Sequence, residues 1–313
     1  MIEMPPREIN IDTKQAIAWN SDRRKVLIAG IASISAVLIN PSITTAQTEG
    51  SNGARRINLS GRQRMLIQRA GKFICLAYLA PKPLPLLASA EQAFSLYKQT
   101  EAGLLDGDDE LGLAPEANTS VRDALTRASD AFLPYGQTIL DAVRRRVVDF
   151  EHLQKIAGLN GQALREMDTA VDLIERVYKS RELSERMAVL INIAGRQRMF
   201  TQRLVLLLGL IRSGIGSDDT RQELFRTINR FSRSLNILQR ITPDALQSEK
   251  VETIIQQLSA AQGRWEALRA DFSTAVWTGT DRSIDDILNA DKQAEDLLKR
   301  MNEIVLLYED AAS

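Results

Sequence analysis

The sequence has very little cysteine and histidine: Cys75 and His152 are the single residues of each type among 313. One cysteine excludes an intramolecular disulfide framework, and the two residues together leave no Cys/His cluster to hold a metal. No nucleophile has a base at a recognisable spacing, so the chain lacks the pattern of a covalent hydrolase or transferase. We therefore expect a protein that is not an enzyme and that carries no metal or cofactor.

Net charge and aromatic residues are scarce as well. Lys plus Arg and Asp plus Glu number 40 each, and aromatic residues make up 5% of the chain. A balanced chain creates no long-range field that would attract nucleic acid, so any anion site must be local. Proline and glycine are sparse beyond residue 120, where Leu, Ala, Arg, Gln and Glu dominate. That composition favours helices.

What the sequence does contain is one stretch of thirteen residues in two copies. Residues 57–69 read INLSGRQRMLIQR, residues 191–203 read INIAGRQRMFTQR, and nine of the thirteen positions are identical. The same offset of 134 relates other residues: Leu164, Met167 and Val171 recur as Leu298, Met301 and Val305. An offset of this length is that of a whole domain rather than a solenoid unit, so we infer an internal duplication.

Each copy is divided into four helical stretches by proline, glycine and turn residues. We therefore expect an all-α protein of two tandem antiparallel four-helix bundles, over residues 55–180 and 181–313. Between residues 162 and 212 no proline and no pair of glycines interrupts the helical pattern, which contains Gly195 within the second copy. This predicts a fourth helix that runs into the fifth and stacks the bundles end to end as a rod. A break in the fourth helix would instead let the halves fold side by side within one chain.

The first 46 residues have the features of an export signal. Arg23-Arg24-Lys25 precede a largely apolar run of 14 residues, Val26 to Ile39, and small residues follow up to Ala46. We expect a signal peptide over residues 1–46, a linker over residues 47–54 and a periplasmic location. Export by the general or the twin-arginine route stays open. The alternative is a segment that is not cleaved and anchors the protein in the inner membrane.

Helical steps of three and four place one seam of residues along each copy of the repeated stretch. The seam consists of Gly61, Arg64 and Gln68 in the first copy and Gly195, Arg198 and Gln202 in the second. Glycine lets another helix approach closely, whereas an arginine in a packed seam is costly without a partner. No carboxylate occurs within either copy. Each arginine therefore requires a distant acid, backbone carbonyls or a bound anion, and a planar guanidinium suits a planar oxyanion such as nitrate.

The residues alone leave two interpretations of these arginines open. In one, each arginine fixes the register of the bundle and is held by Asp or Glu of a neighbouring helix. In the other, two copies of the helix pair across a two-fold axis and their arginines share one anion.

The run Asn58-x-x-Gly61-x-x-Arg64-Met65, with Gln68-Arg69 after it, resembles the signature of PilJ-type sensor domains. Those domains form the N-terminal part of type IV pilus methyl-accepting chemotaxis transducers, and the run is also similar to a box in the periplasmic domain of nitrate/nitrite sensor kinases. The resemblance implies four-helix bundles in which the box helices of two protomers hold nitrate. By position it assigns ligand binding to Gly61, Arg64, Gly195 and Arg198, with Asn58, Gln68, Asn192 and Gln202 as supporting residues.

The expected function is that of an exported sensory or binding protein. It would recognise nitrate or nitrite through the duplicated helix, form a homodimer if the bundles are stacked, and signal to an unidentified partner protein. The alternative is a ligand-free helical interaction or dimerisation module of a type IV pilus or chemosensory system.

Overall fold

The computed structural model describes residues 49–179, 183–245, 250–278 and 281–312. Within these ranges it contains no β-strand, and the expected all-α class is confirmed. The helices are α1 (Glu49–Leu79), α2 (Leu84–Asp106), α3 (Thr119–Arg145), α4 (Phe150–Lys179), α5 (Glu185–Arg212), α6 (Asp218–Ala245), α7 (Lys250–Thr278) and α8 (Ile284–Ala311).

Local sequence signals account for several helix ends. Pro81 and Pro83 follow α1, and proline cannot continue a helix because it lacks the N–H and clashes with the preceding turn. Asn118 caps α3 by accepting a hydrogen bond from the Val121 N–H. Ser283 and Asp286 form a capping box at the start of α8, which satisfies two backbone N–H groups.

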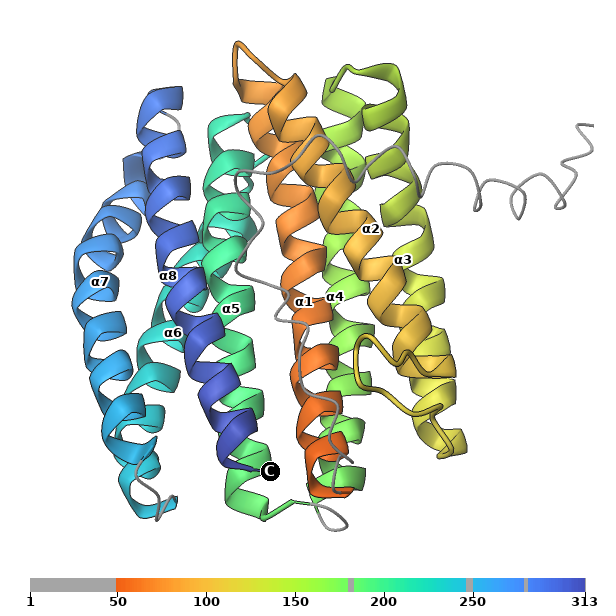
Figure 1. Ribbon diagram of the computed structural model, residues 1–313. Helices are drawn as coiled ribbons and strands as arrows, with labels where there is room; N and C mark the ends of the chain where they lie inside the picture. Colours follow the sequence, from red (N-terminus) through yellow and green to blue (C-terminus); the bar gives the residue numbers. More distant parts are fainter. Residues whose placement is uncertain (1–48, 180–182, 246–249, 279–280, 313) are drawn as a thin grey trace, which may run out of the picture. The chain divides into compact units, whose positions relative to one another are not determined.

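Helices α1–α4 form one antiparallel four-helix bundle and α5–α8 form a second (Figure 1). The two bundles lie side by side, because α1 packs along α5. A Cβ built on Gly61 would lie 4.0 Å from Cα of Gly195, and a Cβ built on Gly209 would lie 2.8 Å from Sγ of Cys75. Both contacts join residues 134 apart. The two motif helices are therefore parallel and in register, related by a pseudo-two-fold axis.

The expected continuous helix from the first bundle to the second is wrong, and so is the end-to-end rod. Helix α4 ends at Lys179 and α5 begins at Glu185. Ser184 has extended backbone angles and its hydroxyl accepts from the Met187 N–H at 3.2 Å, which caps α5. The break lets α5 fold back beside α1, where Gly61 of α1 packs against Gly195 of α5. The side-by-side arrangement left open by the sequence is the one observed.

Helix α1 begins at Glu49, so residues 49–54, expected to be a linker, are helical. The boundary expected between residues 180 and 181 and the leader expected over residues 1–46 fall outside the described residues. None of the described helices is long and apolar enough to cross a membrane.

Helices α1 and α5 occupy the centre of the two bundles (Figure 1). Helix α1 contacts α2, α4, α5 and α8, and α5 contacts α1, α4, α6 and α8. Most side chains of α5 are consequently buried, including polar ones such as Gln197 and Thr201. The duplicated motif therefore lies in the interior and has neighbours from both halves.

Candidate functional site

Arg64 and Arg198 lie together where Gly61 of α1 packs against Gly195 of α5. A Cβ at residue 61 would lie 3.4 Å from Nη2 of Arg64 and 3.5 Å from Nη2 of Arg198. A Cβ at residue 195 would lie 3.4 Å from Nη2 of Arg198 and 3.7 Å from Nη2 of Arg64. Both guanidinium groups therefore lie over both glycines, in space that any side chain at 61 or 195 would enter. The structure brings together all four residues assigned to ligand binding.

Each arginine of this pair reaches the motif asparagine of the other half. Nη2 of Arg64 donates to Oδ1 of Asn192 at 2.7 Å, and Nη2 of Arg198 donates to the backbone oxygen of Asn58 at 3.0 Å. Both guanidinium groups are buried, with Arg64 0% and Arg198 3% exposed. The arginine pair thus links the two halves of one chain.

The two asparagines continue these links to the helices of the opposite half. Nδ2 of Asn58 donates to Glu309 on α8, and Nδ2 of Asn192 donates to Glu175 on α4. Glu175 and Glu309 are themselves 134 residues apart, so the contacts are related by the pseudo-two-fold axis. Asn58 and Asn192 therefore contact the arginine pair and connect it to the last two turns of α8 and of α4.

The counter-ions of the two arginines differ. Nη1 of Arg64 forms an ion pair of 3.0 Å with Oδ1 of Asp168 on α4, so for this arginine the distant acid that the sequence left open as a partner is present. Nη1 of Arg198 reaches only the amide oxygen of Asn302 on α8, at 3.4 Å. Arg198 makes no ion pair with any residue that the structure describes. One arginine of the pair is neutralised and the other is not.

The surroundings act on the protonation of both arginines. Burial lowers the pKa of Arg64, and the nearby Asp168 partly offsets this effect. Burial, together with the positive charges of Arg62 and Arg64, lowers the pKa of Arg198 to about 9. The Nε atoms of Arg64 and Arg198 are also buried without a hydrogen-bond partner among the described residues. Such a buried donor costs about 1–3 kcal/mol, so both groups favour an added acceptor.

Gln68 and Gln202 lie one helical turn further along and serve a different contact. Oε1 of Gln68 accepts from Nη1 of Arg203 at 3.2 Å, and Oε1 of Gln202 accepts from Nη1 of Arg69 at 3.4 Å. No hydrogen bond joins either glutamine to the arginine pair within the described ranges. Their role in the structure is to hold α1 and α5 together, rather than to line the space beside the pair.

Sequence reasoning missed the partners that α4 and α8 supply to the motif arginines. Besides Asp168 and Asn302, these include Asp172, which forms an ion pair of 2.7 Å with Arg196. A signal was present, because the offset of 134 that aligns Met167 with Met301 also aligns Asp168 with Asn302. The offset alone did not identify which helix faces the motif.

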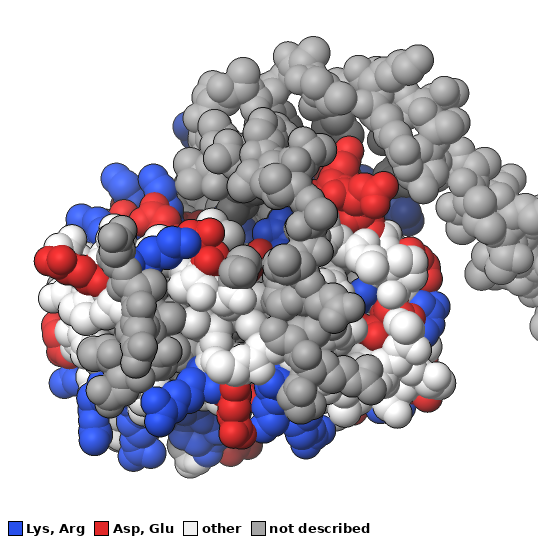
Figure 2. Space-filling model, turned by 60° about the horizontal axis from the view of Figure 1, so that its bottom comes forward, with Lys and Arg blue, Asp and Glu red and all other residues white. Residues whose placement is uncertain are grey.

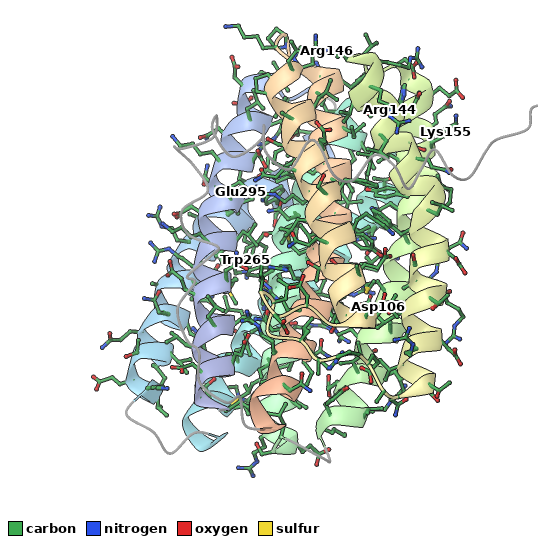
Figure 3. All side chains as sticks on the ribbon, turned by 45° about the vertical axis from the view of Figure 1, so that its right-hand side comes forward. Asp106, Arg144, Arg146, Lys155, Trp265 and Glu295 are labelled. Carbon is green, nitrogen blue, oxygen red and sulfur yellow. The ribbon has the colours of Figure 1, made fainter. Side chains whose placement is uncertain are left out.

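A second cluster of charges joins the two halves nearer the other end of α1. Nζ of Lys72 lies 2.6 Å from both Asp291 and Glu295 of α8, and Nη1 of Arg69 lies 2.7 Å from Glu295. Figure 3 shows Glu295 on α8. The described residues include no group of His, Cys, Asp and Glu suited to a metal ion. On the face drawn in Figure 2, basic and acidic side chains are interspersed with uncharged residues.

Comparison with known proteins gave one match. A family model described as "Type IV pili methyl-accepting chemotaxis transducer N-term" (PilJ) matches residues 44–165 and again residues 182–296. The two matched segments contain the two copies of the duplicated motif. No curated protein and no solved structure matched the chain.

Proposed function

This chain belongs to the PilJ family of type IV pili methyl-accepting chemotaxis transducer N-terminal domains, and on that premise we propose that it binds nitrate or nitrite between its halves. The family's domains are sensory and signalling modules without enzymatic activity, typically periplasmic. The proposal adds the ligand, the place where it binds and the partner protein that would read the bound state.

The observation that carries the proposal is the state of Arg198. The residue is 3% exposed, its guanidinium lies beside a second arginine, and it has no carboxylate partner among the described residues. A buried charge in this position is costly, and a small oxyanion would neutralise it and accept from its free donors. A planar anion such as nitrate matches the guanidinium fork in charge and shape.

A second chain is not needed to pair the arginines, because α1 and α5 provide both within one chain. The expected homodimer therefore stays a prediction, to be checked by sedimentation of the protein without residues 1–46. We expect anion binding at the arginine pair to be transmitted through the hydrogen bond of Asn58 with Glu309. It leads from the site to the end of α8, at the same end of the bundles as the start of α1 (Figure 1). We expect a partner protein to read that end.

The test is isothermal titration with nitrate, nitrite, sulfate and acetate at constant ionic strength, with thermal unfolding in parallel. Nitrate at a hundred times its Kd should stabilise the protein by about 2.7 kcal/mol. Arg198→Ala should abolish this effect and keep the helical circular dichroism spectrum. Lys155→Ala is the matched control, since it removes the same charge from an exposed position of α4 (Figure 3).

The ligand-free interaction module is the second candidate, and one observation favours it. Asp168 pairs with Arg64 and Asp172 pairs with Arg196, as expected if motif arginines only fix the register of the two halves. In that case all four anions should give flat heats, and Arg198→Ala should change the melting temperature equally with and without nitrate.

A further inference from the structure

The duplicated site differs between its two sides. We define the α4 side as Arg64, Arg196, Asp168 and Asp172, and the α8 side as the residues 134 positions away, namely Arg198, Arg62, Asn302 and Leu306. On the α4 side both arginines have a carboxylate, at 3.0 Å for Arg64 and 2.7 Å for Arg196. On the α8 side, Asn302 is at the position equivalent to Asp168. Leu306 is at the position equivalent to Asp172. The duplicated arginines are therefore retained on both sides, but the acids on only one.

The arginines of the α8 side have only neutral partners. Nη2 of Arg62 donates to the hydroxyl of Thr100 at 2.7 Å, and Arg198 donates to the Asn58 backbone and to Asn302. Neither arginine forms an ion pair in the part of the chain that the structure describes. The negative charge that acts on both arginines is that of Glu309, which also forms an ion pair of 2.9 Å with Arg55.

The charges on the α8 side also act on one another. Burial and the charge of Arg55 lower the pKa of Arg62 to about 10, with Glu309 acting in the opposite direction. The pKa of Arg198 is lowered by burial and then by the charge of Arg62. Two positive charges therefore lie together on the α8 side with Glu309 as a partial compensation and no carboxylate bound to either of them, whereas each arginine of the α4 side has a bound carboxylate.

Partly exposed residues of α4 and α8 border both sides of the site. On the α4 side the carboxylate of Asp168, 37% exposed, stands between Arg64 and water. On the α8 side Asn302 is half-buried, and Leu306, one turn further along, is 48% exposed. Arg198 contacts Oδ1 of Asn302, so an anion that reaches Arg198 from this side would meet the Asn302 amide, whose Nδ2 can donate to it.

We propose that the site is one-sided: it takes one small oxyanion per chain on the α8 side, at Arg198 and Arg62 beside Asn302, while Asp168 is a built-in counter-ion that occupies the α4 side. This inference rests on the proposed function and refines it. Asp168 and Asn302 are then the residues that set the number of anions bound. A symmetric site would instead hold the anion midway between Arg64 and Arg198 and would respond equally to changes on either side.

The test exchanges the two side chains one at a time and uses sodium nitrate as the probe. Asn302→Asp gives Arg198 the same carboxylate that Arg64 has, so nitrate affinity should fall at least tenfold, with an equal or higher melting temperature in the absence of nitrate. Asp168→Asn vacates the α4 side, so titration should show the original equivalent of nitrate and a second one. Gln293→Glu is the matched control, because it adds one negative charge at an exposed position of the same helix.

The outcomes separate the two proposals. If Asn302→Asp keeps the wild-type affinity, or if Asp168→Asn loses the single equivalent, the one-sided site is wrong while anion binding stands. If the wild-type protein binds none of the four anions, anion binding fails and the one-sided site with it. If Asn302→Asp fails to fold, Asn302→Leu tests the one-sided site instead. Loss of the amide donor should weaken nitrate binding without neutralising Arg198, and an unchanged affinity would contradict the one-sided site.

Discussion

Gly209 of α5 lies directly against Cys75 of α1, so closely that a Cβ at residue 209 would be 2.8 Å from Sγ of Cys75. This contact is a second close approach of the two central helices, in addition to that of Gly61 and Gly195. Cys75 is the single cysteine of the chain, and burial raises the pKa of its thiol to about 12. Thiol labelling of Cys75 therefore measures how often α1 and α5 separate.

Gly209→Ala should push α1 and α5 apart, because Cys75 cannot retreat from a buried position. The expected loss of stability is about 1–3 kcal/mol, as for other overpacked cores. Denaturant unfolding measures this loss, and labelling of Cys75 should become faster. Gly158→Ala is the control: nothing lies within 4 Å of a Cβ there, so the substitution in α4 should stabilise the helix by about 0.5–1 kcal/mol. Equal effects of the two substitutions would contradict the close packing.

Arg64→Met and Arg198→Met should have different effects on the protein without anion. Methionine keeps much of the volume of arginine and removes the charge. At position 64 it deprives Asp168 of its partner, and since this carboxylate is 37% exposed and can regain water, we expect a loss of only about 1 kcal/mol. At position 198 it removes a charge that has no counter-ion, so stability should be unchanged or higher. Thermal unfolding in an anion-poor buffer checks the order of the two variants; a larger loss for Arg198→Met would show that its charge is compensated.

The acid stability of the interface between α1 and α8 should depend on Glu295. Burial alone would raise its pKa, but the charges and hydrogen bonds of Lys72 and Arg69 lower it to about 2, from an ordinary value of 4.5. A lowered pKa contributes stability that is present above the ordinary value and is lost as the pH falls towards the folded-state value. Asp291 opposes this effect, because burial raises its pKa even though Lys72 lies beside it.

Glu295→Gln should therefore flatten the loss of stability between about pH 4.5 and pH 2, where one such group contributes at most about 1.4 kcal/mol per pH unit. Urea unfolding at a series of pH values measures the slope. Glu252→Gln, at an exposed position of α7, is the control and should keep the wild-type slope. A slope that Glu295→Gln leaves unchanged would mean that Lys72 and Arg69 do not hold this carboxylate in solution.

A fully buried ion pair stabilises the end of the first bundle at which α1 and α3 begin. Nη1 of Arg56 lies 3.1 Å from Oε2 of Glu116, with side chains 2% and 1% exposed, and the Tyr178 hydroxyl donates to Glu116 at 2.9 Å. Glu116→Gln keeps the shape but leaves the charge of Arg56 buried alone, at a cost of about 3–5 kcal/mol. Hydrogen exchange should also show earlier opening of residues 107–118, the connection that Glu116 anchors.

The control for this variant is Glu151→Gln, which breaks the exposed ion pair with Lys155 in α4. Exposed pairs of this kind contribute little, so its unfolding free energy should match that of the wild type. If Glu116→Gln also left the free energy of unfolding unchanged, the connection over residues 107–118 would be held by its backbone contacts rather than by the ion pair.

The main feature that the sequence predicts wrongly is the path of the chain between the two bundles, where a break replaces the expected continuous helix. Residues 180–184 contain neither proline nor glycine, so the helical pattern gave no obvious reason to stop. Ser184 followed by Glu185 is an N-cap signal, but its strength is only about 1 kcal/mol, and serine within a helix is tolerated. Burying α5 along α1 contributes far more than the cap, and that burial becomes visible only once both helices exist in three dimensions.

Other features were predictable because neighbouring residues encode them. The all-α class, the duplication and the seam with Gly61, Arg64 and their repeats follow from helical periodicity and from residue identity at a fixed offset. These properties are local, so the sequence by itself determined them. It also determined that each motif helix would carry a guanidinium where a packed helix normally has an apolar side chain.

Only the tertiary structure decided which groups contact those two charged side chains. Asp168 and Asn302 are more than a hundred residues from the arginines that they contact, and they become partners because α4 and α8 pack against opposite sides of the α1–α5 pair. The carboxylate on one side and the amide on the other give two identical motif arginines different environments. That difference arises from helix packing, which depends on the sum of many distant apolar contacts rather than on any motif.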